Sequence, residues 1–219
     1  MNYSEALSFT FKDESWLKKM AIGGLFGFMS MYAGLLFIFG FFLVGYYVGV
    51  LRNVMNEEET SLPEWSDMSK IFVDGVMGSV IFLIYFIVIG GLCALFIIHV
   101  ASNHYMAEVE QVSLIVFISV ATFIALTFFI NFGLTQYAAT ENFASAFSLA
   151  GLINILRSHF GDFIAIIIFS IILNGILLCA GLVIFAPITN FWGMLIQAHL
   201  FGQYAREIKI STQEHVQVA

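Results

Sequence analysis

The stretch RNVMNEEETSLPEWSDMSKIFVDG, residues 52–75, decides the fold of this chain because it is the longest polar interval between two hydrophobic blocks. It contains Pro63, one of only two prolines in the sequence. The segments on either side of it are almost entirely apolar. The position of this interval therefore determines which way the neighbouring segments face.

Composition assigns the chain to the membrane proteins. Hydrophobic residues make up 60% of its 219 residues and charged residues only 11%, whereas soluble domains have about 25% charged residues. Only helices and closed barrels satisfy their backbone polar groups inside lipid, and the apolar blocks here are continuous rather than alternating, which favours helices. The net charge of −7 offers no basic patch for nucleic acid.

The first 51 residues form two parts. Residues 1–19 are too polar to span a bilayer, and their mixture of aromatic residues and lysines predicts an N-terminal interfacial helix. Residues 20–51 carry no charge and would reach about 48 Å as one helix, against a hydrocarbon core of roughly 30 Å. Either one long tilted helix or a glycine-rich hairpin of two short helices is present, with the break near residues 30–34.

Amphipathic helices are predicted at the membrane surface in two places. In the first, Ser61 and Glu64 fit a capping box, and apolar residues from Trp65 onward recur at spacings of three or four, so residues 52–74 are predicted as a cytoplasmic loop and an amphipathic helix. The second is expected over residues 142–160, because its aromatic and aliphatic residues follow a similar pattern.

The remaining apolar blocks supply four more membrane segments. Residues 75–101 and 112–138 each form one span, joined by a loop without Lys or Arg. Residues 161–206 are too long for one crossing and are predicted as two spans broken near Pro187, before a polar tail over residues 207–219. The whole chain, 1–219, is thus one all-α, polytopic membrane domain with about six membrane segments, the first pair short or re-entrant.

Charge distribution favours the hairpin over a single crossing for the first apolar block. Cytoplasmic loops hold the excess of Lys and Arg. With a hairpin, all eight basic residues fall on one side of the membrane and the loop 102–111, which has none, falls on the other. We therefore expect a multi-pass protein of the cell membrane, either a cytoplasmic or an inner membrane, with both termini in the cytoplasm.

Several motifs together resemble a known family. They are SFTFKDESWLKKMAIGG (8–24), GVLRNV (49–54), LPEW (62–65), IFVDG (71–75) and HLFGQYAREI (199–208). Over nearly the whole chain they resemble the prokaryotic integral membrane proteins of domain of unknown function 4013. That family commonly has prolines at the midpoint of the first apolar block, where this chain has MSMYAG (29–34). The resemblance implies an integral membrane protein and transfers no catalytic or binding residues.

No catalytic, cofactor or metal motif is present. The sequence contains no HExxH, GxSxG, CxxC or phosphate-binding glycine loop. Cys93 and Cys179 lie inside apolar runs and are interpreted as buried small hydrophobes. We therefore predict a non-enzymatic protein without a cofactor or metal.

Five residues stand out as candidate contacts for a partner or a lipid headgroup. Trp65 begins the first surface helix, and His199 is a titratable residue near the end of the last apolar block. Asp74 and Asp162 sit beside glycines where surface helices become spans, with Arg157 nearby in sequence. Capping, solvation or interhelical hydrogen bonding is the alternative interpretation for each of them.

Three functions are compatible with these observations. The first is a scaffold, accessory subunit or lipid-interacting module whose partners are the lipid bilayer, other membrane proteins or a second copy of the chain. The second is a small transporter or channel with a polar path near His199 and Asn174. The third is a membrane enzyme acting on lipid, which requires Asp74, His159 and Asp162 to converge. The absence of Lys, Arg, Asp and Glu from the later spans argues against ion-coupled transport, and we favour the first function.

Overall fold

A computed structural model describes residues 1–32, 37–103, 105–158, 160–180 and 182–218, with the side chains at 154–158 and 209–218 among those outside the description. The described ranges are helical apart from short turns and loops. The helices are α1 (Tyr3–Ser8), η1 (Phe9–Lys12), α2 (Trp16–Tyr32), α3 (Phe37–Met55), α4 (Met68–Tyr85), η2 (Phe86–Gly90), α5 (Gly91–Ala101), α6 (Glu108–Thr140), η3 (Phe143–Phe147), α7 (Leu149–Ser158), α8 (Phe160–Ala180) and α9 (Leu182–Val218).

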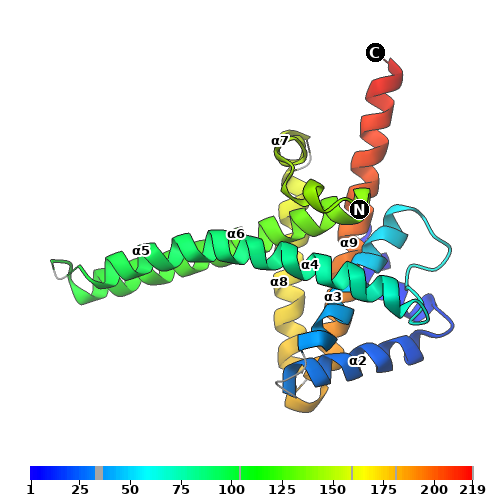
Figure 1. Cartoon of the computed structure of the whole chain (residues 1–219), viewed down its shortest axis with the longest axis horizontal. Coiled ribbons are helices and arrows are strands. Elements are labelled where there is room, and N and C mark those ends of the chain that lie inside the picture. Colours follow the sequence, from blue (N-terminus) through cyan, green and yellow to red (C-terminus); the bar gives the residue numbers. More distant parts are fainter. Residues whose placement is uncertain (33–36, 104, 159, 181, 219) are drawn as a thin grey trace.

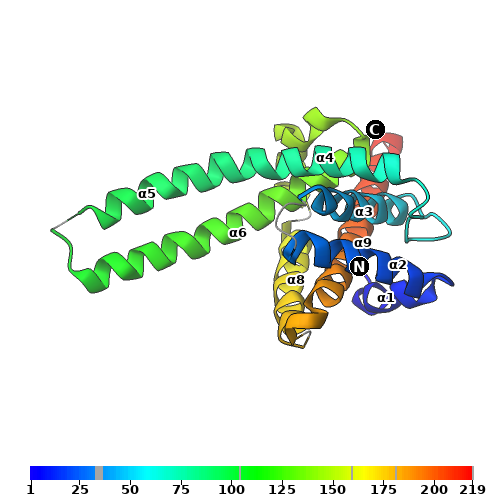
Figure 2. The same cartoon turned by 60° about the horizontal axis from the view of Figure 1, so that its bottom comes forward.

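The molecule consists of a body and a long arm. Figures 1 and 2 show α4, η2 and α5 running antiparallel to α6 as a helical hairpin that projects from a body formed by the other helices. With 33 residues, α6 is about 50 Å long at 1.5 Å per residue. In both views α8 and α9 run across the direction of the arm near its base. Only the base of the arm therefore packs against the body.

Four helical segments in the described ranges are long and apolar enough to cross a membrane. They are Ile38–Met55, Met68–Ala101, Glu108–Thr140 and Phe160–Ala180. In the most apolar stretch of each of the two segments that form the arm, almost no side chain is buried by protein, so lipid is the solvent that fits the surface there. The described part of the chain is therefore all-α and contains four candidate membrane spans.

The core of the body forms where α3, α4, α6, α8 and α9 meet. Tyr46 and Leu51 of α3 and Ile196 and Phe201 of α9 are fully buried there. Glycines allow some of these helices to approach closely. A Cβ on Gly45 of α3 would overlap the carbonyl oxygen of Ile71 in α4, and one on Gly75 would overlap that of Phe41. The crossing of α3 and α4 thus depends on both glycines.

The first apolar block contains two helices. α2 ends at Tyr32 and α3 begins at Phe37, and the ring of Phe26 in α2 packs against Phe39 and Phe42 of α3. Residues 20–51 therefore contribute to two packed helices, and the predicted break near residues 30–34 falls partly on residues 33–36, which lie outside the described residues. The N-terminal segment 1–19 is not one helix, since α1, η1 and the start of α2 divide it.

The predicted amphipathic surface helix with a capping box at Ser61 is wrong. Residues 61–67 are turns and loop, and α4 begins at Met68 with the Asp67 side chain accepting from the Lys70 amide. The reason is tertiary: Trp65 is only 6% exposed, and its ring stacks on that of Tyr46 at a centroid distance of 4.4 Å. Burial of this aromatic pair outweighs local helix signals.

The predicted break near Pro187 also differs from the structure. α8 ends at Ala180 and α9 begins at Leu182, so Pro187 lies inside α9 near its start. As the sixth residue of α9, Pro187 lacks the N–H that would donate to the carbonyl oxygen four residues earlier, yet the backbone is helical on both sides of it. Pro187 packs where Gly27 of α2 leaves space, since a Cβ on Gly27 would lie 3.3 Å from the Pro187 Cβ. The backbone of the predicted polar tail 207–219 is helical through Val218.

Candidate functional site

A buried ion-pair cluster joins the arm to the body. Arg52 of α3 lies 2.8 Å from Asp74 of α4, and the side chains of both are 10% exposed. The Tyr137 hydroxyl of α6 donates to the same carboxylate over 2.8 Å. Glu141 lies 3.1 Å from Arg52 Nε and 3.7 Å from Lys70 Nζ. Because an unpaired buried charge is strongly destabilising, this Arg52 cluster holds α3, α4 and α6 together.

A second buried ion-pair cluster surrounds Lys19 near the start of α2. Lys19 Nζ donates to Asp13 over 2.7 Å and to the Leu62 carbonyl oxygen over 3.0 Å, and it also pairs with Glu64. Trp65 Nε1 in turn donates to the Lys19 carbonyl oxygen over 3.2 Å. This Lys19 cluster therefore fastens the segment 62–65 to the beginning of α2.

The pKa of the Asp13 carboxyl group is shifted by its neighbours in the Lys19 cluster. Burial by itself raises the pKa of Asp13, but hydrogen bonds from Lys19 and from the Ser15 hydroxyl and amide hold that pKa below its ordinary value. Asp13 is thus an ionised structural acceptor at neutral pH.

His199 lies at a polar cavity of about 310 Å³. The lining residues come from the N-terminal segment, the polar interval and α9, and are Glu5, Phe9, Lys12, Asp13, Glu58, Glu59, Thr60, Ser61, Leu62 and His199. The imidazole is 4% exposed, its Nδ1 lies 3.0 Å from Gln203 Nε2, and its ring lies 4.3 Å from that of Phe9. This environment holds the histidine in place between α9 and η1.

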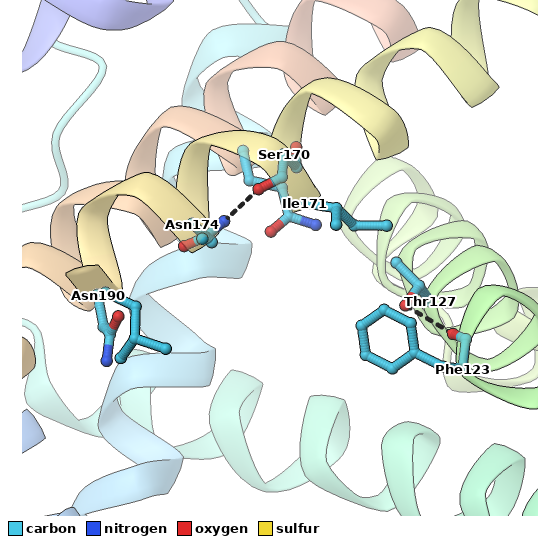
Figure 3. A pocket seen from close by; sticks show the side chains of 9 residues that line it. Phe123, Thr127, Ser170, Ile171, Asn174 and Asn190 are labelled. Atoms are coloured by element: carbon cyan, nitrogen blue, oxygen red, sulfur yellow. Dashed lines mark hydrogen bonds between the residues drawn. The ribbon is translucent and has the colours of Figure 1, made fainter. Parts of the chain in front are cut away.

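A different groove of about 420 Å³ separates α6 from α8 and α9, and we call it the α6–α8 groove. Its lining carries no charge and consists of Phe123, Thr127, Ser170, Ile171, Asn174, Gly175, Leu178, Asn190 and Gln197. Figure 3 shows Ser170, Ile171 and Asn174 on one side and Phe123 and Thr127 on the other. The groove therefore combines amide and hydroxyl groups with a larger apolar surface.

Some polar side chains that line this groove have hydrogen-bond partners in the described protein and others do not. Asn174 Nδ2 donates to the Ser170 carbonyl oxygen over 2.8 Å, as Figure 3 shows. The Ser170 hydroxyl is buried and has no hydrogen-bond partner, and no hydrogen bond joins the side chain of Asn190 to another described residue. Among the described residues, the Ser170 hydroxyl is thus buried and unsatisfied, and the Asn190 side chain makes no hydrogen bond.

A chain of hydrogen bonds leads from the groove into the body. Gln197 Nε2 donates to Asn131 Oδ1 over 2.8 Å, and the Tyr47 hydroxyl donates to the same oxygen over 2.9 Å. Asn131 Nδ2 donates to the Thr127 carbonyl oxygen over 2.7 Å. The amides link α3, α6 and α9, which is the interhelical hydrogen bonding expected for polar groups among apolar helices.

The five predicted site residues do not gather in one place. Trp65 belongs to the Lys19 cluster, Asp74 to the Arg52 cluster, and His199 to the polar cavity. Asp162 is exposed in the first turn of α8, where the helix dipole favours an acid. The side chain of Arg157 lies outside the described residues, as does His159. His199 and Asn174, predicted to share a polar path, line separate cavities.

Sequence reasoning missed the residues that matter most in these sites. The sequence places Lys19 only among the lysines of the predicted N-terminal interfacial helix and does not single out Ser170. One signal was available for the groove: Ser170 and Asn174 are four residues apart in an isoleucine-rich helix, so they share one helical face. Within the described ranges, no group of three or more His, Cys, Asp or Glu side chains is arranged to hold a metal ion.

Comparison with known proteins identifies a family. The family model described as Protein of unknown function (DUF4013) matches residues 28–186, well over half of the chain. No curated protein and no solved structure matches the chain.

Proposed function

Because the chain belongs to the DUF4013 family, whose description assigns no activity, we propose from its geometry a non-enzymatic, multi-pass membrane protein that acts by association. Its role is that of a scaffold, an accessory subunit or a lipid-interacting module. The partners are the bilayer itself and other membrane proteins or a second copy of the chain.

The observation that carries this proposal is the exposed apolar surface of the distal arm, residues 86–101 and 108–127. Leu95, Phe96 and Ile98 of α5 are 66%, 63% and 64% exposed, and Phe117 of α6 is 70% exposed. Soluble proteins rarely expose contiguous apolar patches larger than a few hundred Å². Lipid or another membrane helix is the environment that such a surface requires.

The state of the ionisable residues supports association over catalysis. Arg52, Asp74 and Lys19 all sit in ion pairs that join helices, so their charges are used in holding the fold. Acid–base catalysis needs a titratable group within hydrogen-bond reach of a substrate. The α6–α8 groove is lined by no such group, whereas the polar cavity at His199 does contain titratable side chains.

The proposed topology has six segments and cytoplasmic termini. The arm supplies two, α2 and α3 form the first, short pair, and α8 and the first part of α9 form the last. Arg52 and Lys70 lie at the base of the arm, whereas the loop at its tip has no Lys or Arg. Positive charges concentrate on the cytoplasmic side of membrane proteins, which supports a cytoplasmic base and an outward tip.

Cysteine accessibility tests this topology. In a background with Cys93→Ala and Cys179→Ala, single cysteines at Glu58 and Glu108 are treated with an impermeant maleimide in right-side-out and inside-out vesicles. We expect Glu108→Cys to react in right-side-out vesicles and Glu58→Cys in inside-out ones. Reaction of both from the same side would contradict the proposed topology.

Native mass spectrometry of the full chain released from mild detergent tests association itself. The expected species is the protein with bound lipid, a second copy or another membrane protein. A bare monomer in every detergent tried, from cells that make the protein at its natural level, would contradict the proposal.

A small transporter or channel is the second candidate, and the hydrogen-bond chain Gln197–Asn131–Tyr47 favours it. A path across the body would have to open along these amides. Asn131→Leu would then abolish flux of a small polar solute from proteoliposomes, while Thr122→Val on the arm would leave it unchanged. Absence of any flux through the wild-type protein would remove this candidate.

A further inference from the structure

We propose that the polar cavity at His199 binds a small amine that also carries hydroxyl groups, of the amino sugar or amino polyol class. The site adds a water-soluble ligand to the associations proposed above and does not rest on them. Three features of the cavity support it: an imidazole N–H that bonds to no described residue, an excess of carboxylates in the described lining, and a volume that fits a small molecule.

The tautomer of His199 is fixed by Gln203. Gln203 Oε1 accepts from the Asn2 amide over 2.7 Å, so the other end of this side-chain amide is its NH₂ group. That group donates to the Asn2 carbonyl oxygen over 3.3 Å and to His199 Nδ1 over 3.0 Å. A ring nitrogen that accepts a hydrogen bond carries no proton, so the proton of the neutral imidazole is on Nε2.

The Nε2–H group of His199 is a donor that faces the cavity. The residue is only 4% exposed, and Nε2 bonds to no described residue. Unlike the enclosed hydroxyl of Ser170, this nitrogen keeps some accessible surface, and the open space against the ring is the polar cavity. Because a buried donor without a partner is unfavourable, an occupant of the cavity should present an oxygen to Nε2.

The described lining of the cavity is acidic. Four carboxylates and one ammonium group line it, from Glu5, Asp13, Glu58, Glu59 and Lys12. Four negative charges and one positive charge give a formal sum of −3. Asp13 is paired with Lys19, and Glu5 lies 3.8 Å from Lys12. The side chains of Glu58 and Glu59 form no ion pair with a described residue, so two carboxylates are available to a cation.

These charges and the shape of the lining narrow the class of cation. A ligand with a phosphate group would be repelled by the carboxylates. A metal ion is not supported, because no three His, Cys, Asp or Glu side chains of the described chain are arranged to hold one. A quaternary ammonium group is recognised by aromatic faces, and the ring of Phe9 already packs against the imidazole. A primary ammonium group, with three N–H donors, fits the carboxylates.

Hydroxyl groups on the same ligand fit the rest of the lining. Thr60 and Ser61 bring side chains that both donate and accept, and His199 Nε2 needs an acceptor. The volume of about 310 Å³ corresponds to about ten water molecules at roughly 30 Å³ each. It lies at the lower end of the range of small-molecule pockets. An amino sugar or amino polyol offers one ammonium group and several hydroxyls at this size.

The experiment is a saturation-transfer NMR titration of the full chain in detergent micelles with D-glucosamine. Two comparison ligands separate its parts. D-Glucose has a hydroxyl where glucosamine has its ammonium group, and propylamine has the ammonium group without the oxygens. We expect glucosamine to bind about tenfold more tightly than either, because each lacks one set of hydrogen bonds.

A pair of exposed glutamates tests the charge. Glu58→Gln combined with Glu59→Gln should weaken glucosamine binding about tenfold and leave glucose binding unchanged. The matched control is Glu108→Gln combined with Glu110→Gln, which removes two exposed carboxylates from the first turn of α6 on the arm. This control should bind glucosamine as the wild type does.

The donor is tested at His199 itself. His199→Leu should weaken glucosamine binding about fivefold, as loss of one hydrogen bond predicts, and His199→Gln, which keeps an amide donor, should recover most of that loss. Thermal unfolding verifies that each variant is folded. If His199→Leu does not fold, the exposed glutamate variants still decide the outcome.

Three results would overturn the inference. The first is equal binding of glucosamine and either comparison ligand. The second is an equal loss of binding in the two double glutamate variants, since net charge and not the cavity would then attract the amine. The third is no binding of glucosamine to the wild type up to its solubility limit, which would mean that only water fills the cavity. Each result leaves the proposed association intact, because native mass spectrometry tests that separately.

Discussion

The base and the distal part of the arm are both apolar helix, yet they meet different surroundings. At the base, Gly75 and Asp74 contact α3 directly, and Ile81 is fully buried. In the distal part, Leu95 and Phe96 are about two-thirds exposed. Both parts of the arm are helical, but only the base packs closely against other helices of the protein. Substitutions at the base should therefore lower the free energy of unfolding, whereas substitutions in the distal part should change it very little.

The largest contrast is expected between two glycines. Gly45→Val places methyl groups where the backbone of α4 lies, and overlap with the Ile71 carbonyl oxygen cannot be relieved by moving a side chain. We expect a loss of more than about 3 kcal/mol in the free energy of unfolding. Gly91→Val, in open space on the arm, should change it little. Thermal unfolding in detergent measures both, and equal melting temperatures for the two variants would contradict the comparison.

An intermediate effect is expected at the Arg52 cluster. Arg52→Gln leaves Asp74 buried with only the Tyr137 hydroxyl as a close partner, which should cost about 3 kcal/mol of unfolding free energy. Adding Asp74→Asn should restore part of the loss, because the uncompensated charge is then removed. Lys12→Gln, at a pair 3.8 Å long whose lysine is 65% exposed, should cost less than about 0.5 kcal/mol. Similar losses of unfolding free energy for Arg52→Gln and Lys12→Gln would contradict the expectation that the buried ion pair contributes more to stability than the exposed one.

The smallest effect depends on pH and belongs to the Lys19 cluster. The pKa of Asp13 is lower in the folded chain than its ordinary value, so the unfolded state takes up the proton first as pH falls. The stabilisation by Asp13 is thus complete above its unfolded pKa of about 3.9 and is lost as pH falls through the folded value. Asp13→Asn should destabilise the protein by about 1 kcal/mol at pH 7, and by progressively less as the pH falls below the unfolded pKa.

The control for this pH effect is the exposed neighbour Glu14. Unfolding of Glu14→Gln, measured by denaturant titration across the same pH range, should follow that of the wild type. A destabilisation by Asp13→Asn that is the same at pH 7 and pH 3 would mean that the carboxylate charge is not what Lys19 recognises.

Sequence reasoning succeeded where local chemistry decides structure. The length of the uncharged block 20–51 is too great for one crossing, and the block is divided between α2 and α3. It failed where a distant partner decides. Trp65 has the spacing of an amphipathic helix, but Tyr46 and Lys19 hold it in a buried turn. Pro187 looks like a helix break, but it lies inside α9 against Gly27.

The amino-acid sequence by itself determined the class of this protein, a helical chain for lipid surroundings. Composition and helical length are enough for that, because the transfer of each segment between water and hydrocarbon depends on its own residues. Only the tertiary structure decided that Arg52 pairs with Asp74, 22 positions away, and that Ser170 faces Thr127 across a groove. Such pairs depend on how separate helices cross, and glycine contacts between helices set those crossings.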